Sequence, residues 1–248
     1  GVRLVGSEMC IRDRIGQIWK DRPPMSKEPV WILDEAYSGR STKDKLAAVR
    51  EKMKEKGAEV HLLASLYDIA WLLNVRGNDI SYVPVVLSYL ALTQEQCIWF
   101  LQEEVVDDTL REYLQKNGIT TRPYEAFYEY VKTLENQTIL LNRAVVNTKI
   151  CNNLPESAQM IDAEDPTLEM KAVKNETEIS NTRKAHVKDA VAMCRFMYWL
   201  KKNVGKIPMT EISASDYLES LRREQEGLLD LSLSLIHISE PTRRTPIS

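Results

Sequence analysis

Between about residues 40 and 165, short apolar segments alternate with segments whose apolar residues recur at helical spacing. Ser41 can cap a helix in which Leu46, Val49 and Met53 share one face, and Gly57 follows where a left-handed cap is expected. Further helices are predicted over about 65–75, 105–116 and 124–134, and strands over 60–64, 84–92, 97–101, 138–142 and 159–162. The pattern predicts an α/β layer fold. Since the second and third strands form a hairpin, the sheet is expected to be mixed.

The two ends of the chain correspond to one DNA segment read on opposite strands. Residues 4–14 read LVGSEMCIRDR and residues 233–243 read LSLIHISEPTR, and both can be encoded by a sequence that resembles a library adapter. Unrelated biological termini are not expected to share one segment, and such scars are set aside before fold reasoning. We therefore expect 1–14 and 233–248 to be adapter-derived and non-native. The natural polypeptide would run from about 15 to 232, with both natural ends missing.

Without these flanks, 28 basic and 33 acidic residues remain, a net charge of −5. This composition is mildly acidic and gives no sign of the clustered basic surface that binds nucleic acid, so no nucleic acid partner is expected. Three scattered cysteines (Cys97, Cys151 and Cys194) favour a reducing compartment, and we expect a cytoplasmic protein. No apolar run approaches the roughly 18 residues that a membrane span needs, so no membrane partner is expected.

The organisation changes along the chain. Residues 15–39 are rich in Trp, Pro and charge, and their prolines oppose a continuous helix, which favours a linker. Residues 40–165 carry the α/β pattern, which ends near Asp165-Pro166. Beyond it, the sequence pattern predicts two helices, over 175–202 and 210–226, with Gly205 and Pro208 between them. Two helices bury too little surface for an independent core, so they are expected to open a further domain and to expose an apolar face.

Several segments, in order, resemble the three-domain Xaa-Pro aminopeptidases, the aminopeptidase P family. They are IWKDRPP, DIAWLLNVRGND, PVVLSYLAL, LEMKAVKNETEISNTRKAHVKDAVAM, TEISASDYLESLRREQEG and LLDLS. The resemblance implies that 15–39 closes a first N-terminal domain and that 40–165 is a second creatinase N-terminal-like domain. Residues 166–232 would then be the truncated start of a pita-bread metallopeptidase domain.

The resemblance also implies a chemistry. Enzymes of this family remove the N-terminal residue from peptides with proline in second position, using two metal ions, typically Mn²⁺, to activate a bridging water. Their two Asp, two Glu and one His ligands lie downstream of the segment that matches Leu231-Ser232. No catalytic or metal residue is therefore assigned here, no cofactor is expected in this fragment, and the fragment itself is expected to be inactive. The alternative is a non-catalytic creatinase-like binding or dimerisation module. A homodimer is a candidate assembly for the full-length protein.

Arg76, Asn78 and Asp79 form a polar loop at the end of a predicted helix. Binding groups commonly lie in such loops, so these residues are candidates for a substrate rim or an interdomain contact. The alternative is turn chemistry, because Gly77 and Asn78 suit left-handed backbone and Asp79 can bond main-chain groups.

Other polar residues carry weaker signals. His61 alternates with apolar residues and is interpreted as a strand-face histidine, and His186 favours a structural role over a cleft contact. The acidic pairs 103–104 and 107–108 suit the positive end of a helix and a solvated face.

Overall fold

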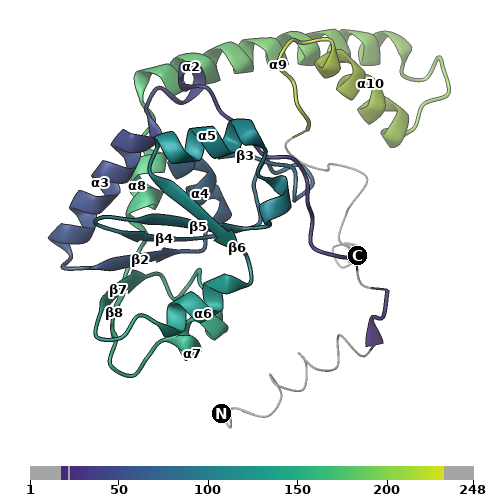
Figure 1. Cartoon of the computed structure of the whole chain (residues 1–248). Coiled ribbons are helices and arrows are strands. Elements are labelled where there is room, and N and C mark those ends of the chain that lie inside the picture. The colour runs from purple at the N-terminus through teal and green to yellow at the C-terminus, as the bar shows by residue number, and fades with distance from the viewer. Residues whose placement is uncertain (1–17, 22, 232–248) are drawn as a thin grey trace, which may run out of the picture.

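The computed structural model describes residues 18–21 and 23–231 of the chain. The adapter-like ends, 1–14 and 233–248, lie outside the described residues, as do residues 15–17, 22 and 232. A mixed sheet covered by helices on both faces forms the body, and a long helix runs along and beyond its upper edge (Figure 1).

The sheet has six strands in the order β6-β5-β4-β2-β7-β8. Their bounds are β2 Val60–Leu63, β4 Tyr89–Thr93, β5 Cys97–Leu101, β6 Ile119–Pro123, β7 Thr138–Leu141 and β8 Gln159–Asp162. Strand β4 is antiparallel to β2 and to β5, whereas the β2–β7, β5–β6 and β7–β8 pairs are parallel. The predicted mixed sheet is confirmed, and its antiparallel pairs are the β4–β5 hairpin and the β2–β4 pair.

Alternate side chains of each strand enter two separate cores. In β5, Trp99 and Leu101 enter the core under one layer of helices, whereas Ile98 and Phe100 enter the core on the opposite face. Helices α3 Thr42–Glu55, α4 Leu66–Leu73, α5 Asp108–Lys116 and α8 Pro166–Ala172 cover the first face, and α6 Ala126–Lys132 and α7 Thr148–Asn153 cover the second (Figure 1). All five residues of β5 are buried, as a central strand covered on both faces requires.

Helix boundaries follow the predicted caps in most places. The Ser41 side chain accepts a hydrogen bond from Asp44 N at the start of α3, and Gly57 has φ +69° just after it. At the start of α4, by contrast, the Ser65 side chain makes no cap hydrogen bond. Asp68 is buried and forms an ion pair with Lys171 instead.

Two small elements occupy the stretch predicted to be a linker. Strand β1, Trp31–Ile32, pairs antiparallel with β3, Val75–Arg76, and helix α2, Glu35–Ser38, follows it. A 3-10 turn, η1 (Glu103–Val105), precedes α5, whose side-chain cap is Asp107. The acidic residues before α5 therefore cap the helix or face solvent, as predicted.

Beyond α8, the chain forms the long helix α9, Glu176–Asn203, and the antiparallel helix α10, Glu211–Arg223. Tyr217 of α10 stacks on Trp199 of α9 with ring centroids 4.1 Å apart. Most of α9 lies beyond the sheet, with α10 beside it (Figure 1). No helix within the described ranges is long and apolar enough to cross a membrane.

Candidate functional site

The three candidate residues, Arg76 at the end of β3 and Asn78 and Asp79 in the loop after it, have different surroundings. The Arg76 guanidinium donates from Nη1 to the carbonyls of Ala70 (2.9 Å) and Val75 (2.8 Å). Burial lowers the pKa of Arg76, and the Glu178 carboxylate opposes that effect. Arg76 is thus held against the domain while its charge faces the first turn of α9.

The Asp79 side chain stabilises its own loop by hydrogen bonding. Its Oδ2 accepts a hydrogen bond of 2.7 Å from Leu87 N, and its backbone N–H donates to Val85 O. These bonds close the 79–87 loop, so turn chemistry is present at Asp79.

The predicted left-handed backbone at Gly77 and Asn78 is wrong. Among the described residues around this loop, positive φ occurs at Asn74 (50°) and Tyr82 (66°), not at either predicted residue. Gly77 is required for a different reason, because a Cβ there would lie 2.8 Å from Val86 Cγ2.

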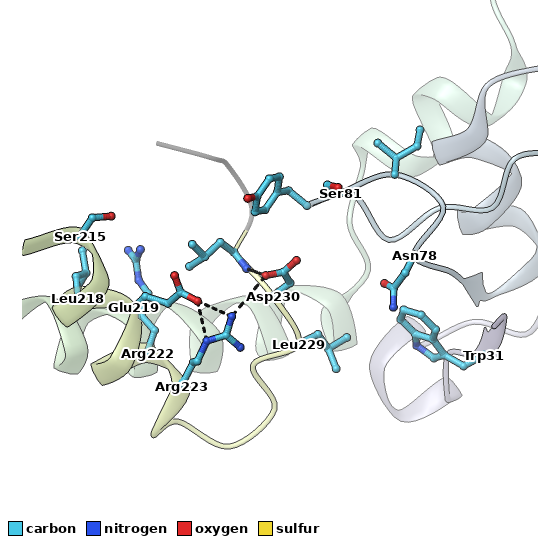
Figure 2. Close-up of a pocket in the computed structure, with 13 residues that line it drawn as sticks. Trp31, Asn78, Ser81, Ser215, Leu218, Glu219, Arg222, Arg223, Leu229 and Asp230 are labelled. Atoms are coloured by element: carbon cyan, nitrogen blue, oxygen red, sulfur yellow. Dashed lines mark hydrogen bonds and ion pairs between the residues drawn. The ribbon is translucent and has the colours of Figure 1, made fainter. Parts of the chain in front are cut away.

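Asn78 lines a cavity that has a volume of about 750 Å³. One wall comes from β1 and the loop after β3, and the other comes from α10 and the segment 229–231 (Figure 2). Figure 2 shows Asn78 above Trp31 on one side, and Arg223 between Glu219 and Asp230 on the other. The lining residues are Trp31, Asn78, Ile80, Ser81, Tyr82, Ser215, Leu218, Glu219, Arg222, Arg223, Leu229, Asp230 and Leu231.

The two arginines of this cavity are already paired with carboxylates. Arg223 bonds Glu219 through Nε at 2.7 Å and lies 3.8 Å from Asp230. Arg222 donates to Asp189 of α9 at 2.7 Å. A ligand here would therefore meet neutral polar and apolar groups on the Trp31 side and compensated guanidinium groups on the other.

A smaller cavity of about 330 Å³ lies where the sheet domain meets α8 and α9. Arg76 lines it together with Lys171 and Lys174, and Glu178 supplies an opposing charge. Tyr67, Ala70, Trp71, Pro84 and Val85 complete the lining. Arg76 and Asn78 thus border different cavities, although they are two residues apart in the sequence.

Hydrogen bonds join the start of α9 to α2. They lie at the junction, the place where the sheet domain meets α8 and the start of α9. Asn175 caps α9 and donates from Nδ2 to Ser38 O at 2.8 Å, and Asn181 donates to Ala36 O at 2.9 Å. A Cβ on Gly39, which has φ +65°, would lie 2.5 Å from Asn175 Oδ1. The capping box was visible in the sequence as N-E-T-E, but no local signal showed that its asparagine also reaches α2.

A buried lysine, which the sequence reasoning missed, lies beneath this junction. Lys45 is 1% exposed and donates to Trp71 O (2.8 Å) and to Asn74 Oδ1 (2.7 Å). Burial lowers its pKa to about 8, against the field of Glu178. Lysine side chains are almost never fully buried, so the residue type favoured an exposed Lys45, although its four-residue spacing to Val49 puts it on the buried face of α3.

The two histidines among the described residues differ in burial. His61 is fully buried on a strand face of β2, as predicted. His186 is exposed on α9, so the part of the chain that the structure describes does not show the packing role predicted for it.

The described residues do not fit a metal centre. Among residues 18–21 and 23–231, no group of three His, Cys, Asp or Glu side chains converges as metal coordination requires. No step through a metal ion can be derived from these residues.

Comparison with protein families gives a direct match. Residues 21–178 match the model of the creatinase/prolidase N-terminal domain. The chain belongs to this family. The matched range contains the whole six-stranded sheet and continues into the first turn of α9.

Individual relatives of this creatinase/prolidase-family chain are Xaa-Pro aminopeptidases by name. Xaa-Pro aminopeptidase 1 of Dictyostelium discoideum is 32% identical over 231 residues, which cover 90% of this chain and 37% of that protein. The crystal structure of X-prolyl aminopeptidase from Caenorhabditis elegans, described as a cytosolic enzyme with a di-nuclear active site, matches with a TM-score of 0.82 and 29% identity. That match covers 88% of this chain and 37% of the enzyme.

A more distant structure shares the fold alone. Xaa-Pro dipeptidase from Bacillus anthracis matches with a TM-score of 0.53 and 15% identity, over 74% of this chain and 49% of that enzyme. The chain spans only 35 to 41% of the length of the curated relatives that it matches.

Proposed function

We propose that the chain is the N-terminal-domain and junction portion of a dinuclear-metal aminopeptidase that releases the N-terminal residue from peptides with proline in second position. The observation that supports this most is the likeness to the Caenorhabditis elegans enzyme over 88% of the chain. At 88% of the chain, this likeness reaches past the family domain that ends at residue 178 and therefore into α9.

In this proposal the parts of the chain have separate roles. Residues 15–39 close a preceding N-terminal domain, 40–165 form the second creatinase-like domain, and 166–232 begin the pita-bread domain. The two Mn²⁺ ions, or similar divalent ions, would be held by residues of the full-length protein. Because the described residues bring no three metal donors together, the chain alone is proposed to be inactive.

Asn78 and Arg76 are proposed to act at the border of the active-site region. Asn78 borders the cavity of about 750 Å³ between the sheet domain and α10, where it would form part of a substrate rim. Arg76 faces Glu178 across the smaller cavity and would act as an interdomain contact. Asp79 would shape the loop that carries Asn78.

The test compares two proteins in one assay. The full-length protein encoded by the source gene and the 248-residue chain are each loaded with Mn²⁺ and given an Xaa-Pro peptide. A peptide with alanine in place of proline and a metal-only sample are the controls. We expect release of the first residue by the full-length protein only, and only from the proline peptide.

Two results would contradict the proposal. Hydrolysis by the 248-residue chain above the metal-only control would show that it is not an inactive portion. A folded full-length protein with no Xaa-Pro activity would favour the alternative, a creatinase-like binding or dimerisation module. A cytoplasmic location and a homodimer complete the proposal, and fractionation of source cells and light scattering of the full-length protein test them.

A further inference from the structure

Inside the sheet domain, the side chains of His61 and Asp165 face each other, although the two residues are far apart in the sequence. His61 lies in the middle of the sheet, where β2 is flanked by β4 and β7, and it is 0% exposed. Asp165 precedes α8 and is 4% exposed. His61 Nε2 and Asp165 Oδ1 are 3.8 Å apart, and within the described chain neither atom has a hydrogen-bond partner.

The hydrogen bond on the other side of the imidazole fixes its tautomer. His61 Nδ1 lies 3.1 Å from Leu140 O. A carbonyl oxygen can only accept, so Nδ1 must carry a proton and donate it. In a neutral ring Nε2 is then a bare acceptor, and it faces the oxygen of a carboxylate that is also an acceptor. Two buried acceptors facing each other are both unsatisfied, whereas a proton on either atom would let it donate to the other once the 3.8 Å separation shortens to hydrogen-bond distance.

Two other charged groups act on the pair. Asp68 of α4 and Lys171 of α8 form an ion pair with each other, and their charges oppose one another at Asp165. From β7 only the Leu140 carbonyl reaches the ring. On α3, Lys52 bonds Glu55 of the same helix at 2.7 Å, and both of these side chains are exposed.

Asp165 also departs from the usual behaviour of an aspartate before a helix. At an N-cap, the carboxylate ordinarily accepts from backbone amides of the first turn. Asp165 makes no such side-chain bond to α8, and its Oδ1 is directed at His61. Two residues further, Thr167 Oγ1 is buried and likewise unpartnered within the described residues. The start of α8 therefore lacks a side-chain cap, and two of its buried polar atoms, Asp165 Oδ1 and Thr167 Oγ1, have no hydrogen-bond partner within the described residues.

We propose that His61 and Asp165 hold a single proton between them, and that this buried pair fixes the start of α8, and through it the base of α9, to the sheet. The two residues act as positioning residues for the junction. The proton is carried either as a carboxylic acid donating to Nε2 or as an imidazolium donating to the carboxylate, and both forms contain the same number of protons.

The pair makes a distinctive prediction about pH. Burial raises the pKa of Asp165 from 3.8 to about 7, Asp68 adds to the rise, and Lys171 opposes it. Burial lowers the pKa of His61 from 6.5 to about 4, against the Leu140 carbonyl and Asp68. The folded pair thus holds one proton between about pH 4 and 7, and the unfolded pair holds one between 3.8 and 6.5. Because these ranges nearly coincide, the folded and unfolded states bind nearly the same number of protons. The pair is therefore expected to make the stability of the wild-type chain depend little on pH.

When either partner is removed, the pKa shift of the other is no longer balanced, and stability is expected to depend on pH. In Asp165→Asn, only His61 titrates, so stability is lost as pH falls from 6.5 towards 4. In His61→Asn, whose amide can still donate to Leu140 O, only Asp165 titrates, so stability is lost as pH rises from 3.8 towards 7. In each variant the folding equilibrium constant is expected to change by up to about tenfold per pH unit.

The experiment is urea unfolding of the 248-residue chain at pH steps from 4 to 8, with Glu164→Gln as the control for loss of a neighbouring exposed carboxylate. We expect the wild type and Glu164→Gln to run parallel, and the two variants of the pair to slope in opposite directions. Profiles of both variants parallel to the wild type would overturn the shared proton.

A measurement on the wild-type chain covers the case in which a variant fails to fold. The ¹⁵N shifts of His61 are followed from pH 5 to 8. We expect Nδ1 to stay protonated and the ring to show no titration centred on the ordinary histidine value of 6.5. Titration of His61 at that value would overturn the proposal.

Discussion

The sheet domain and the α9–α10 pair bury their side chains to very different degrees. In α4, six of eight residues are buried, whereas Ala192 is the only buried residue among the 28 of α9. Val187, Val191 and Tyr198 of α9 are 65%, 46% and 65% exposed. The domain is held by two apolar cores. The helical pair is held by its junction with α2, by one aromatic stack and by surface ion pairs, which contribute much less.

The largest contrast is expected between a core residue and an α9 residue. Phe100 is 0% exposed and packs edge-on against Phe127 at 5.1 Å. Phe100→Ala should lower the free energy of unfolding by about 3–5 kcal/mol, because it leaves a cavity. Val187→Ala, the matched control on α9, should change it by less than about 0.5 kcal/mol. Urea unfolding followed by circular dichroism measures both, and equal losses would break the comparison.

Lys45 tests whether the domain depends on a buried polar contact near the junction. Lys45→Met leaves Trp71 O and Asn74 Oδ1 without their donor and should cost about 2–4 kcal/mol. The folded pKa of Lys45, about 8, lies below the ordinary 10.5. The unfolded chain therefore binds more protons in that range, and wild-type stability should rise as pH increases from 8 to 10.5.

Unfolding at pH 7 to 10.5 checks this expectation, with Lys54→Met as the exposed control. The rise should persist in Lys54→Met and disappear in Lys45→Met. A rise of equal size in both variants would assign the effect to other groups.

Two glycines with the same backbone conformation distinguish the cost of a strained backbone from the loss of the contact with α9. Gly39 and Gly57 have φ of 65° and 69°, but an added Cβ meets Asn175 and Thr177 only at Gly39. Gly57→Ala should cost about 1 kcal/mol, and Gly39→Ala about 2–3 kcal/mol with loosening of α9. Hydrogen exchange in the first turns of α9 is the measurement. Equal protection of α9 in the two variants would show that the α2 contact does not hold it.

The smallest effect is expected from the ion pairs between α9 and α10. Arg222→Gln removes the bond to Asp189 and should reduce protection of α10 amides by less than about 1 kcal/mol. The reduction should shrink in high salt, because salt screens exposed pairs. Arg111→Gln, which removes an exposed pair within α5, is the control and should leave α10 unchanged.

The sequence predicted well the elements whose apolar residues follow a clear period. Helix α3, the β4–β5 hairpin and helix α9 are present where predicted, although the first hairpin strand begins at Tyr89 instead of Pro84. Strand β6 was missed because its residues, ITTRP, are mostly polar and partly exposed at the sheet edge. Helices α7 and α8 are short, and their positions depend on packing against the sheet.

The candidate site was less predictable, because its contacts join distant segments. The polar loop at Arg76 and Asn78 could be identified locally, but the cavity walls contributed by α10 could not. His61 looked like an ordinary strand residue, and only the fold brings Asp165 to it across more than a hundred residues. Lys45 shows the same limit, since its partners belong to the end of α4.

Native-state hydrogen exchange of the whole chain tests the contrast between the two regions most directly. Amides of β2, β4 and β5 should exchange only through global unfolding, with one common free energy. Amides in the second half of α9 and in α10 should exchange through local opening at a clearly lower free energy. If the α10 amides instead exchange with the same free energy as those of β4, the two regions unfold as one unit and the account is contradicted.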